Sequence, residues 1–540
     1  MLGLLRAAGL VILFSGYASS HPGPKSPPST PVSTTTCQGK TYTYNELAGF
    51  GSIPSDARDK FGDTLSIGSA AALTGWKKKT NPKTKQTTYT GTLYGLPDRG
   101  WNTQGTQNTI PRVHLFDITF TPESSTSGSP NLFFAYRNTI LLASPQGEPL
   151  TGLDPDSYTS SLEPSFPKLP TSSYPGDGFG GSGPGGTRIA IDAEGLLLNS
   201  DGSFWISDEY GPYLYLFSPS GKMLQAVPPP DAILPVRNWT APGGNPSFSS
   251  DNAPIFDSAK RPTPRDPIAG RQNNQGFEGL TGSPETRDGK RDIWVMLQSA
   301  GRLEGGQNAA TRRNARLLKY QVGKEKKGGE KRREVKLEGE YVVPLPVFTD
   351  AQGRTRVAAQ SEIHYVSDDQ LLVLPRDSSV GACTDNPTSV YRHVDVIDVK
   401  KATDVKGKKY DGFNESIASA EGVLKPGIKP ATLCPWIDFN VNEELVKFGL
   451  RNGPPPPAAL PVNLSLLNEK WESLVLVPTE DGKKDDEYFL FAISDNDFIT
   501  QNGFINGGRI PYKDGSGCSL DQQALVFRVT LPKGSKPLVG

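Results

Sequence analysis

The segment RIAIDAEGLLL (residues 188–198) is followed closely by FWISDEYGP (204–212) and YLYLFSPSG (213–221). Each segment is short and apolar, and residues such as Gly, Pro, Ser and Asp separate it from the next, which is typical of antiparallel β-strands joined by turns. The first segment contains Glu194 followed by glycine, and the second ends in Asp208 and Glu209. A unit of three or four such strands indicates one blade of a β-propeller.

This unit recurs along the chain. Glu194 has equivalents at Glu278, Glu362 and Glu472, at intervals of 84, 84 and 110 residues. Their segments read QGFEGLTG (275–282), QSEIHYV (360–366) and KWESLVLV (470–477). A fifth, degenerate copy, TLSIGSAAALTG (64–75), has Ser69 where the others have glutamate. Serial repetition of one strand unit is the sequence signature of radial or solenoid architectures.

The repeats predict an all-β fold, a β-propeller of about six four-stranded blades, of which five are recognised in the sequence. A sixth could lie between Asp404 and Asn468, where GPPPPAALP (453–461) obscures the pattern. A blade needs about 40–50 residues, so the longer intervals contain inserted loops. A β-sandwich is the alternative, but five like units in series fit radial repetition better.

The first 20 residues have the features of a secretory signal peptide, namely one basic residue, an apolar run over 7–14 and small residues before the predicted cleavage after Ser20. Residues 21–36 are rich in Pro, Ser and Thr and are predicted to be a leader, so that the propeller domain spans 37–540. No later apolar run approaches the roughly 18 residues of a membrane span. We therefore expect a secreted, extracellular protein that does not associate with membranes.

The charges balance, with 57 Lys and Arg against 57 Asp and Glu. Non-specific binding to nucleic acid or to an anionic membrane is therefore not expected. The expected partner is a small molecule, and the protein is expected to be a monomer.

Four cysteines in an oxidising compartment suggest two disulfides, with three connectivities open and buried free thiols as the alternative. We favour Cys37–Cys518 and Cys383–Cys434, because the first bond would join the two ends of a closed ring. Three sequons would carry glycans if the source is eukaryotic, at Asn238, Asn414 and Asn463.

In a propeller the first strand of every blade lines the central channel, so residues at equivalent positions converge at one mouth. The four repeated glutamates and the acidic residues that end the second strands would gather there, together with Arg99 and Arg376. Crowded carboxylates need a divalent cation, arginine partners or raised pKa values. Oxygen ligands without many histidines favour Ca²⁺ or Mg²⁺. Alternatively, each glutamate accepts backbone N–H groups of the neighbouring blade and only fastens the ring.

His364 lies two residues beyond Glu362, so it faces the same side of its strand and could reach the channel. A catalytic role for this imidazole competes with that of an ordinary, hydrogen-bonded core residue.

Several motifs together resemble the phytase-like family of secreted or periplasmic proteins, described as having an esterase-like activity of phytase. They are YGLPDRGWN (94–102), IDAEGLLL (191–198), FWISDEYGP (204–212), QGFEGLTG (275–282), SEIHY (361–365), WESLVLV (471–477) and AISDNDF (492–498). The resemblance spans residues 61–532 and implies a β-propeller that hydrolyses phosphate esters. The histidine-acid-phosphatase signature R-H-G-x-R-x-P does not occur.

On this resemblance we expect a phosphomonoesterase that uses Ca²⁺. The expected metal ligands are Glu194, Asp208, Glu278, Glu362 and Glu472. Arg99 and Arg376 would clamp the phosphate by forked hydrogen bonds, and Glu209 or Asp495 would act as general base. Two other readings remain open: a calcium-dependent lactonase or carboxyl esterase, and a non-catalytic extracellular binding module.

Overall fold

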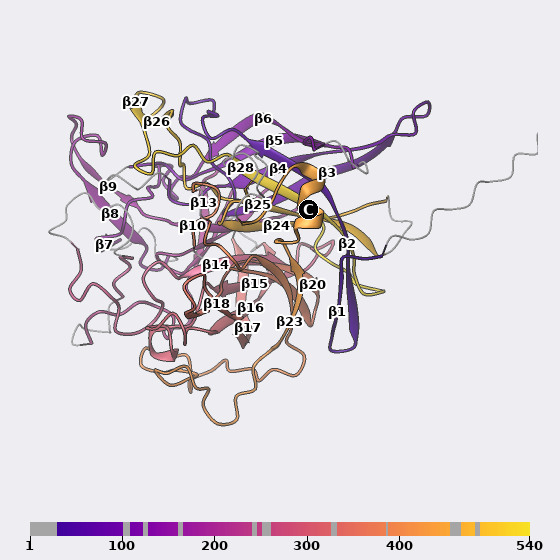
Figure 1. The fold of residues 1–540 in the computed structure, drawn as a ribbon. Helices are drawn as coiled ribbons and strands as arrows, with labels where there is room; N and C mark the ends of the chain where they lie inside the picture. Colours follow the sequence, from indigo (N-terminus) through magenta and orange to yellow (C-terminus); the bar gives the residue numbers. More distant parts are fainter. Residues whose placement is uncertain are drawn as a thin grey trace, which may run out of the picture. The chain divides into compact units, whose positions relative to one another are not determined.

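The computed structural model describes residues 30–100, 108–122, 128–159, 166–239, 246–250, 261–325, 332–377, 379–384, 387–453, 466–480 and 486–540. Residues Pro31–Gly540 form one compact unit. Their regular structure is almost entirely β-strand (Figure 1). None of the described helices is both long and apolar enough to cross a membrane. The chain is thus all-β, as the sequence predicts.

Four antiparallel sheets of four strands follow one another along the chain. The first holds β3 (Ala70–Thr80), β4 (Thr87–Leu96), β5 (Arg112–Phe120) and β6 (Leu132–Leu141). The second holds β10 (Ala193–Leu198), β11 (Phe204–Asp208), β12 (Leu214–Phe217) and β13 (Met223–Val227). The third holds β14 (Phe277–Gly282), β15 (Arg291–Leu297), β16 (Asn314–Glu325) and β17 (Arg333–Pro344). The fourth holds β20 (Ala359–Ser367), β21 (Gln370–Arg376), β22 (His393–Asp398) and β23 (Thr432–Asp438).

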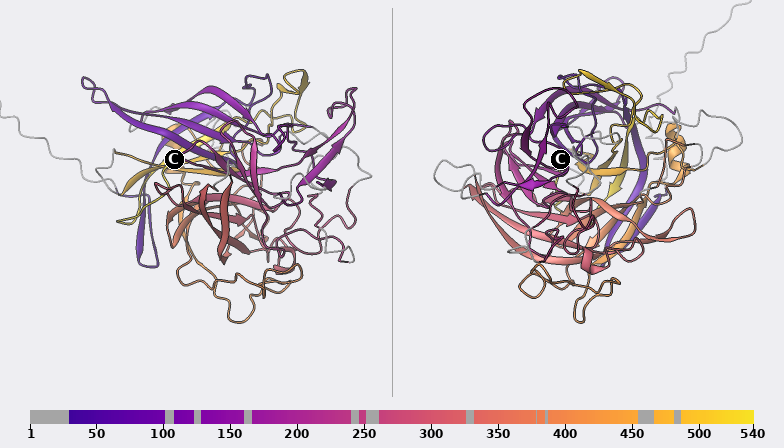
Figure 2. Two further views of the ribbon diagram at one scale, coloured as in Figure 1. Left: turned by 180° about the vertical axis from the view of Figure 1, so that it is seen from behind. Right: turned by 90° about the vertical axis from the view of Figure 1, so that its left-hand side faces the viewer.

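The fifth sheet joins both ends of the compact unit. In spatial order it contains β1 (Ser33–Cys37), β2 (Lys40–Ile53), β28 (Gln522–Thr530), β25 (Glu487–Ser494) and β24 (Trp471–Pro478). The long β2, indigo in Figure 2, pairs antiparallel with the yellow β28. Because β1 begins at Ser33, the last residues of the predicted leader (21–36) belong to a strand.

The first strands of the five sheets contact one another in the order β3, β10, β14, β20 and β24, and β24 in turn contacts β3. The glycine that follows each of two repeated glutamates allows this approach. A Cβ on Gly195 would lie 2.3 Å from Cβ of Leu280, and one on Gly279 would lie 2.7 Å from the backbone nitrogen of Ile363. Any side chain here would push the neighbouring strands apart.

The interval from Asp404 to Asn468 holds no separate four-stranded sheet among its described residues. It supplies β23 to the fourth sheet, together with α1 (Asn442–Leu445) and η4 (Val446–Phe448). The other short elements form small sheets and one turn: β7 (Ser157–Tyr158), β8 (Pro170–Tyr174), β9 (Gly186–Ile189), β18 (Val347–Thr349), β19 (Thr355–Val357), β26 (Gly503–Ile505), β27 (Ile510–Tyr512) and η3 (Arg302–Glu304).

The two disulfides are Cys37–Cys434 and Cys383–Cys518, with Cα–Cα distances of 5.7 and 5.8 Å. The predicted pairing, Cys37–Cys518 and Cys383–Cys434, is therefore wrong. Cys37 ends β1, and β1 lies against β23, which contains Cys434. The first bond thus joins the closing fifth sheet to the fourth sheet rather than joining the two chain ends.

Two of the three predicted glycosylation sites, Asn238 and Asn414, are exposed. Asn463 lies outside the described residues. Glycosylation itself stays a prediction.

The disulfide pairing has a direct test. Mass spectrometry of peptides from the non-reduced protein should find Cys37 linked to Cys434 and Cys383 linked to Cys518. Because the first bond closes a loop of 397 residues, replacing both of its cysteines with serine should lower the free energy of unfolding by about 2–5 kcal/mol. A peptide that links Cys37 to Cys518 would contradict the structure.

Candidate active site

Three of the repeated glutamates project from β-bulges near the start of first strands. The register between first and second strand shifts at Glu194, between Ala193 and Leu196. It shifts likewise at Glu278 and at Glu472. A bulge inserts an extra residue and re-aims the side chain that it carries. The bulges therefore direct these glutamates away from the ordinary strand alternation.

The three glutamates line one cavity of 430 Å³. The other lining residues come mostly from the segments around the ends of second strands: Asp98, Arg99, Glu209, Asn273, Asn274, Gln275, Gln298, Arg376, Ser379, Val380, Glu469, Lys470 and Asp497. The structure thus brings together Arg99, Arg376 and Glu209, which sequence reasoning placed at this mouth, with Glu194, Glu278 and Glu472. We refer to this cavity as the acidic pocket.

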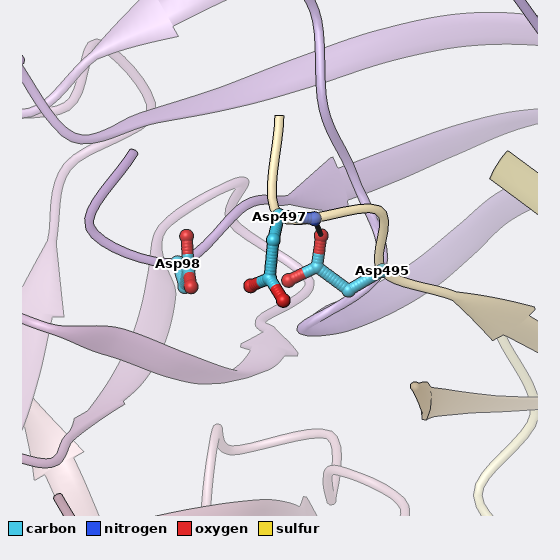
Figure 3. Close-up of side chains that lie close together, drawn as sticks. All are labelled: Asp98, Asp495 and Asp497. Carbon is cyan, nitrogen blue, oxygen red and sulfur yellow. Dashed lines mark hydrogen bonds between the residues drawn. The ribbon is translucent and has the colours of Figure 1, made fainter. Parts of the chain in front are cut away.

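One half of the acidic pocket is organised around Lys470. Its Nζ lies 2.7 Å from Oδ1 of Asp497, 2.9 Å from Oδ2 of Asp495, 3.3 Å from Oε2 of Glu472 and 3.5 Å from Oδ2 of Asp98. Figure 3 shows three of these carboxylates, with the backbone N–H of Asp497 donating to Asp495. The three aspartates are close enough together to hold a metal ion. However, the ammonium group of Lys470 already forms an ion pair with each of them.

The charges fit this arrangement. Burial alone would lower the pKa of Lys470, but the surrounding carboxylates, Asp495 first among them, raise it well above its usual value. The lysine is therefore a permanent cation and not a nucleophile or base.

The other half of the acidic pocket is lined by Glu194 and Glu209. Asp192 is not one of the lining residues, but it and these two glutamates each place a carboxylate oxygen within 4.8 Å of the others. Glu209 is only 1% exposed, and no N–H group of the described residues donates to its oxygens; the carboxyl of Glu278 lies within hydrogen-bond reach of it. Oδ1 of Asp192 is buried without a partner. Glu194 accepts a hydrogen bond of 3.1 Å from the hydroxyl of Ser69. The half around Glu209 therefore contains carboxylate oxygens to which no N–H group donates, whereas the carboxylates of the other half are paired with Lys470.

Proton binding compensates part of this negative charge. Burial, and then the charge of Asp192, raise the pKa of Glu209 to about 8, against the opposing effect of Arg99 and Arg271. Burial and the charge of Glu209 raise the pKa of Glu278 well above its usual value. Burial, Glu278 and Asp192 do the same for Glu194. Near neutral pH this half of the pocket must hold protons or a cation.

The two arginines bridge the pocket. Nη1 of Arg99 donates to Oδ2 of Asp192 at 2.5 Å and to the side-chain oxygen of Asn274. Nη2 of Arg376 donates to Glu472. The Nε–H groups of both arginines are buried without a partner. Each guanidinium is thus fixed by one carboxylate and keeps one donor unused.

Glu362 and Asp208 lie outside the acidic pocket, where neither can join the predicted metal ligands. Oε1 of Glu362 accepts the backbone N–H groups of Leu280 at 3.0 Å and of Ile363 at 2.8 Å, so this glutamate fastens neighbouring strands. Asp208 accepts backbone N–H groups of Asp192, Tyr210 and Gly211. It therefore positions the turns that carry Asp192 and Glu209.

His364 is also away from the pocket. It lines a different cavity with Glu362, and its Nε2 lies 3.0 Å from the carbonyl oxygen of Leu538. Burial lowers its pKa to about 4, against the effect of that hydrogen bond. The imidazole of His364 is thus neutral, buried and hydrogen-bonded. These surroundings are those of an ordinary core histidine, the alternative to a catalytic role.

Asp495 does not line the cavity. It accepts hydrogen bonds from the hydroxyl of Ser66, from Lys470 and from the backbone N–H of Asp497. These three donors leave it poorly placed to be the general base that sequence reasoning proposed.

Sequence reasoning missed Asp192, Asn274 and Lys470. A signal existed for two of them, since Asp192 and Lys470 each stand two residues before a repeated glutamate. Asn274 lies immediately before the segment 275–282 and has positive φ, a conformation for which asparagine is enriched.

Comparison with known proteins gives the family. Residues 86–498 match the phytase-like family, described as "Esterase-like activity of phytase". A protein of the fungus Arthroderma benhamiae, called an uncharacterized secreted protein, is 45% identical over 490 residues, which cover 87% of this chain and 90% of that protein. The family description suggests a hydrolase. The chain belongs to the phytase-like family.

Proposed function

We propose that this protein is a secreted hydrolase of phosphate esters that uses a divalent cation in the acidic pocket. The family description and the composition of the pocket support the activity. The predicted signal peptide, the secreted relative and two disulfides, which are typical of oxidising compartments, support secretion.

We also propose that the five sheets are the blades of a five-bladed β-propeller. The cyclic contacts of β3, β10, β14, β20 and β24 support it, as does the sharing of the fifth sheet by the first and last strands. Closing the ring in this way places strands from both ends of the chain in one hydrogen-bonded sheet. The blade number is then five, which equals the number of repeats recognised in the sequence and is one fewer than the expected total of about six.

The observation that carries the functional proposal is the buried carboxylate of Glu209, to which no N–H group of the described residues donates, beside the carboxyl groups of Asp192, Glu194 and Glu278. Seven carboxyl groups line the acidic pocket against three cationic side chains, and Lys470 satisfies mainly one half. Leaving buried carboxylate oxygens without any partner is costly. A divalent cation held by Asp192, Glu194 and Glu209 would remove this cost, and oxygen-only ligands favour Ca²⁺ or Mg²⁺.

In this proposal a divalent cation bound by Asp192, Glu194 and Glu209 would offset the negative charge of the substrate's phosphate group. The unused Nε–H groups of Arg99 and Arg376 donate to phosphate oxygens and orient the ester. Glu278, whose pKa is raised by burial and by the charge of Glu209, would give its proton to the departing ester oxygen as water attacks phosphorus. The phosphate product would at first carry both protons of the water, and one of them would then return to Glu278. Glu209, proposed from sequence as a base, instead acts as a cation ligand.

One observation favours a second candidate, a lactonase or carboxyl esterase with the same cation. Arg99 and Arg376 each pair with a carboxylate of the protein, which a substrate without phosphate would leave undisturbed. The two candidate activities can be distinguished by comparing the hydrolysis of a phosphate ester and of a carboxyl ester by one variant, Arg376→Lys.

Arg376→Lys keeps the charge that pairs with Glu472 but removes the Nε–H donor and the planar fork. For a phosphate esterase, kcat/KM on an aryl phosphate should fall about tenfold or more, the cost of one charge-assisted hydrogen bond. Hydrolysis of an aryl acetate should be unchanged. Equal acetate cleavage by the wild type and by Arg376→Lys, with no phosphatase activity in either protein, would favour the carboxyl esterase.

Glu209→Gln removes one ligand charge at constant size. We expect phosphate release from an aryl phosphate in Ca²⁺ to fall about 100-fold, as for loss of a metal-site interaction. Glu362→Gln is the matched control, because the amide oxygen can still accept the N–H groups of Leu280 and Ile363 and the residue lies outside the pocket. Equal rates for both variants and the wild type would remove the acidic pocket from the mechanism.

Without divalent cations the protein should become less stable as pH rises from 5 to 8, and Ca²⁺ should counteract this loss of stability. Glu209 titrates near pH 8 in the folded chain but near 4.3 when unfolded, so the folded state binds more protons between these values. Without divalent cation, the melting temperature should therefore fall as pH rises from 5 to 8. Added Ca²⁺ should raise it more at pH 8 than at pH 5. A Ca²⁺ effect that is equal at both pH values would contradict a cation on these carboxylates.

A further inference from the structure

Two consecutive residues at the acidic pocket have an uncommon backbone conformation. Asp497 and Phe498 have φ angles of 50° and 56°, which lie in the left-handed region that residues other than glycine rarely adopt. Asp497 lines the acidic pocket, and its Oδ1 lies 2.7 Å from Nζ of Lys470. A backbone of this kind persists only where the surrounding structure holds it. The contacts that hold this turn therefore also position a carboxylate of the pocket.

The segment around Cys518 provides several of these contacts. The side-chain amide of Asn496 donates to the carbonyl oxygen of Leu520 at 2.8 Å. The backbone N–H of Leu520 in turn donates to the carbonyl oxygen of Ile499 at 3.0 Å. The side-chain amide of Gln501 donates to the carbonyl oxygen of Cys518 at 3.1 Å. Residues on both sides of the turn are thus bonded to the segment that carries the cysteine.

The disulfide of this cysteine reaches a second part of the pocket wall. Its other sulfur belongs to Cys383, which lies in residues 379–384, here called the wall segment. Two residues of this segment line the acidic pocket: Ser379 and Val380. The backbone N–H of Gly381 donates to Oε2 of Glu469 at 3.0 Å. The wall segment is thus fastened to the pocket by a hydrogen bond and by the disulfide.

The two disulfides of the protein have different surroundings. Cys37 is 0% exposed and belongs to a large hydrophobic core shared by strands of the fourth and fifth sheets. Cys383 and Cys518 are both partly exposed. They pack against a small separate cluster, which contains Ala382, Leu466, Leu520 and Ile499. The first bond therefore fastens the sheets, whereas the second fastens loop segments beside the acidic pocket.

We propose that the Cys383–Cys518 disulfide positions the wall of the acidic pocket, and that a dithiol reductant which opens this bond lowers hydrolysis while the protein stays folded. In that step the dithiol gives two electrons and two protons, so that the S–S bond breaks, two cysteine thiols form and the dithiol becomes a disulfide. The effect on hydrolysis rests on the proposed function. The fastening of the wall segment to the turn at Asp497 does not.

The test compares two double variants, Cys383→Ser with Cys518→Ser, and Cys37→Ser with Cys434→Ser as the matched control. Both remove one bond and should lower the melting temperature, so stability alone does not decide. Hydrogen exchange followed by mass spectrometry should be at least about tenfold faster in residues 379–384 and 496–501 of the first variant, and unchanged there in the control. The first variant's kcat/KM on an aryl phosphate should fall about tenfold or more, while the control keeps the wild-type value.

A reduction experiment covers the case in which a variant does not fold. The wild type is treated with dithiothreitol, and alkylation followed by mass spectrometry identifies the opened bond. We expect Cys383–Cys518 to open first, because both of its cysteines are partly exposed, and the exchange in residues 379–384 and 496–501 to accelerate at that stage. Earlier opening of Cys37–Cys434, or unfolding before either bond opens, would contradict the proposal.

The outcomes separate this inference from the proposed function. Faster exchange in the first variant, in a protein that hydrolyses no phosphate ester, would refute the phosphatase and leave the disulfide as the fastener of the pocket wall. Exchange equal to that of the wild type would overturn the inference. So would faster exchange without any change in kcat/KM of an active enzyme, or a fall in kcat/KM that the control shares.

Discussion

The mutual repulsion of the carboxylates gathered near the first strands of the five sheets is the constraint on which the site depends. Repeated bulges aim glutamates there, and the second strands add aspartates and Glu209. Such a group is stable only if cations or protons offset its charge. Lys470 meets this need for Asp98, Asp495, Asp497 and Glu472, the last of which also binds Arg376.

The half of the pocket around Glu209 has no such lysine, so its carboxylates are less completely neutralised by the protein's own cations. Arg99 offsets Asp192, but no N–H group of the described residues donates to Glu209, and burial and the charge of Asp192 raise its pKa to about 8. A cation that binds there must displace protons, so cation binding and pH are linked. Both halves of the pocket thus come from one repeat pattern, and single residues such as Ser69 and Lys470 make them different.

The strand repeats and the all-β class could be predicted from the sequence. Because equivalent positions of repeated units converge, the sequence also predicted that one group of side chains meets: Arg99, Arg376, Glu194, Glu209, Glu278 and Glu472. It could not distinguish Glu362, which sits at the same repeat position but turns its carboxylate to the N–H groups of Leu280 and Ile363. Nor could it pair the cysteines, since the contact of β1 with β23 depends on how the N-terminal strands join the fifth sheet. Lys470 was not among the predicted site residues, because it stands at the repeat position where the second sheet has the acidic residue Asp192, so the repeat does not predict a cation there.

The most direct test of the account is a calorimetric titration of Ca²⁺ and Mg²⁺ into the purified protein, its Asp192→Asn variant and its Asp98→Asn variant. We expect one divalent cation to bind per chain in the wild type and in Asp98→Asn, where Lys470 remains. Binding should be lost or weakened about 10–100-fold in Asp192→Asn. Absence of binding by the wild type, or loss of binding in Asp98→Asn alone, would contradict a cation site built from Asp192, Glu194 and Glu209.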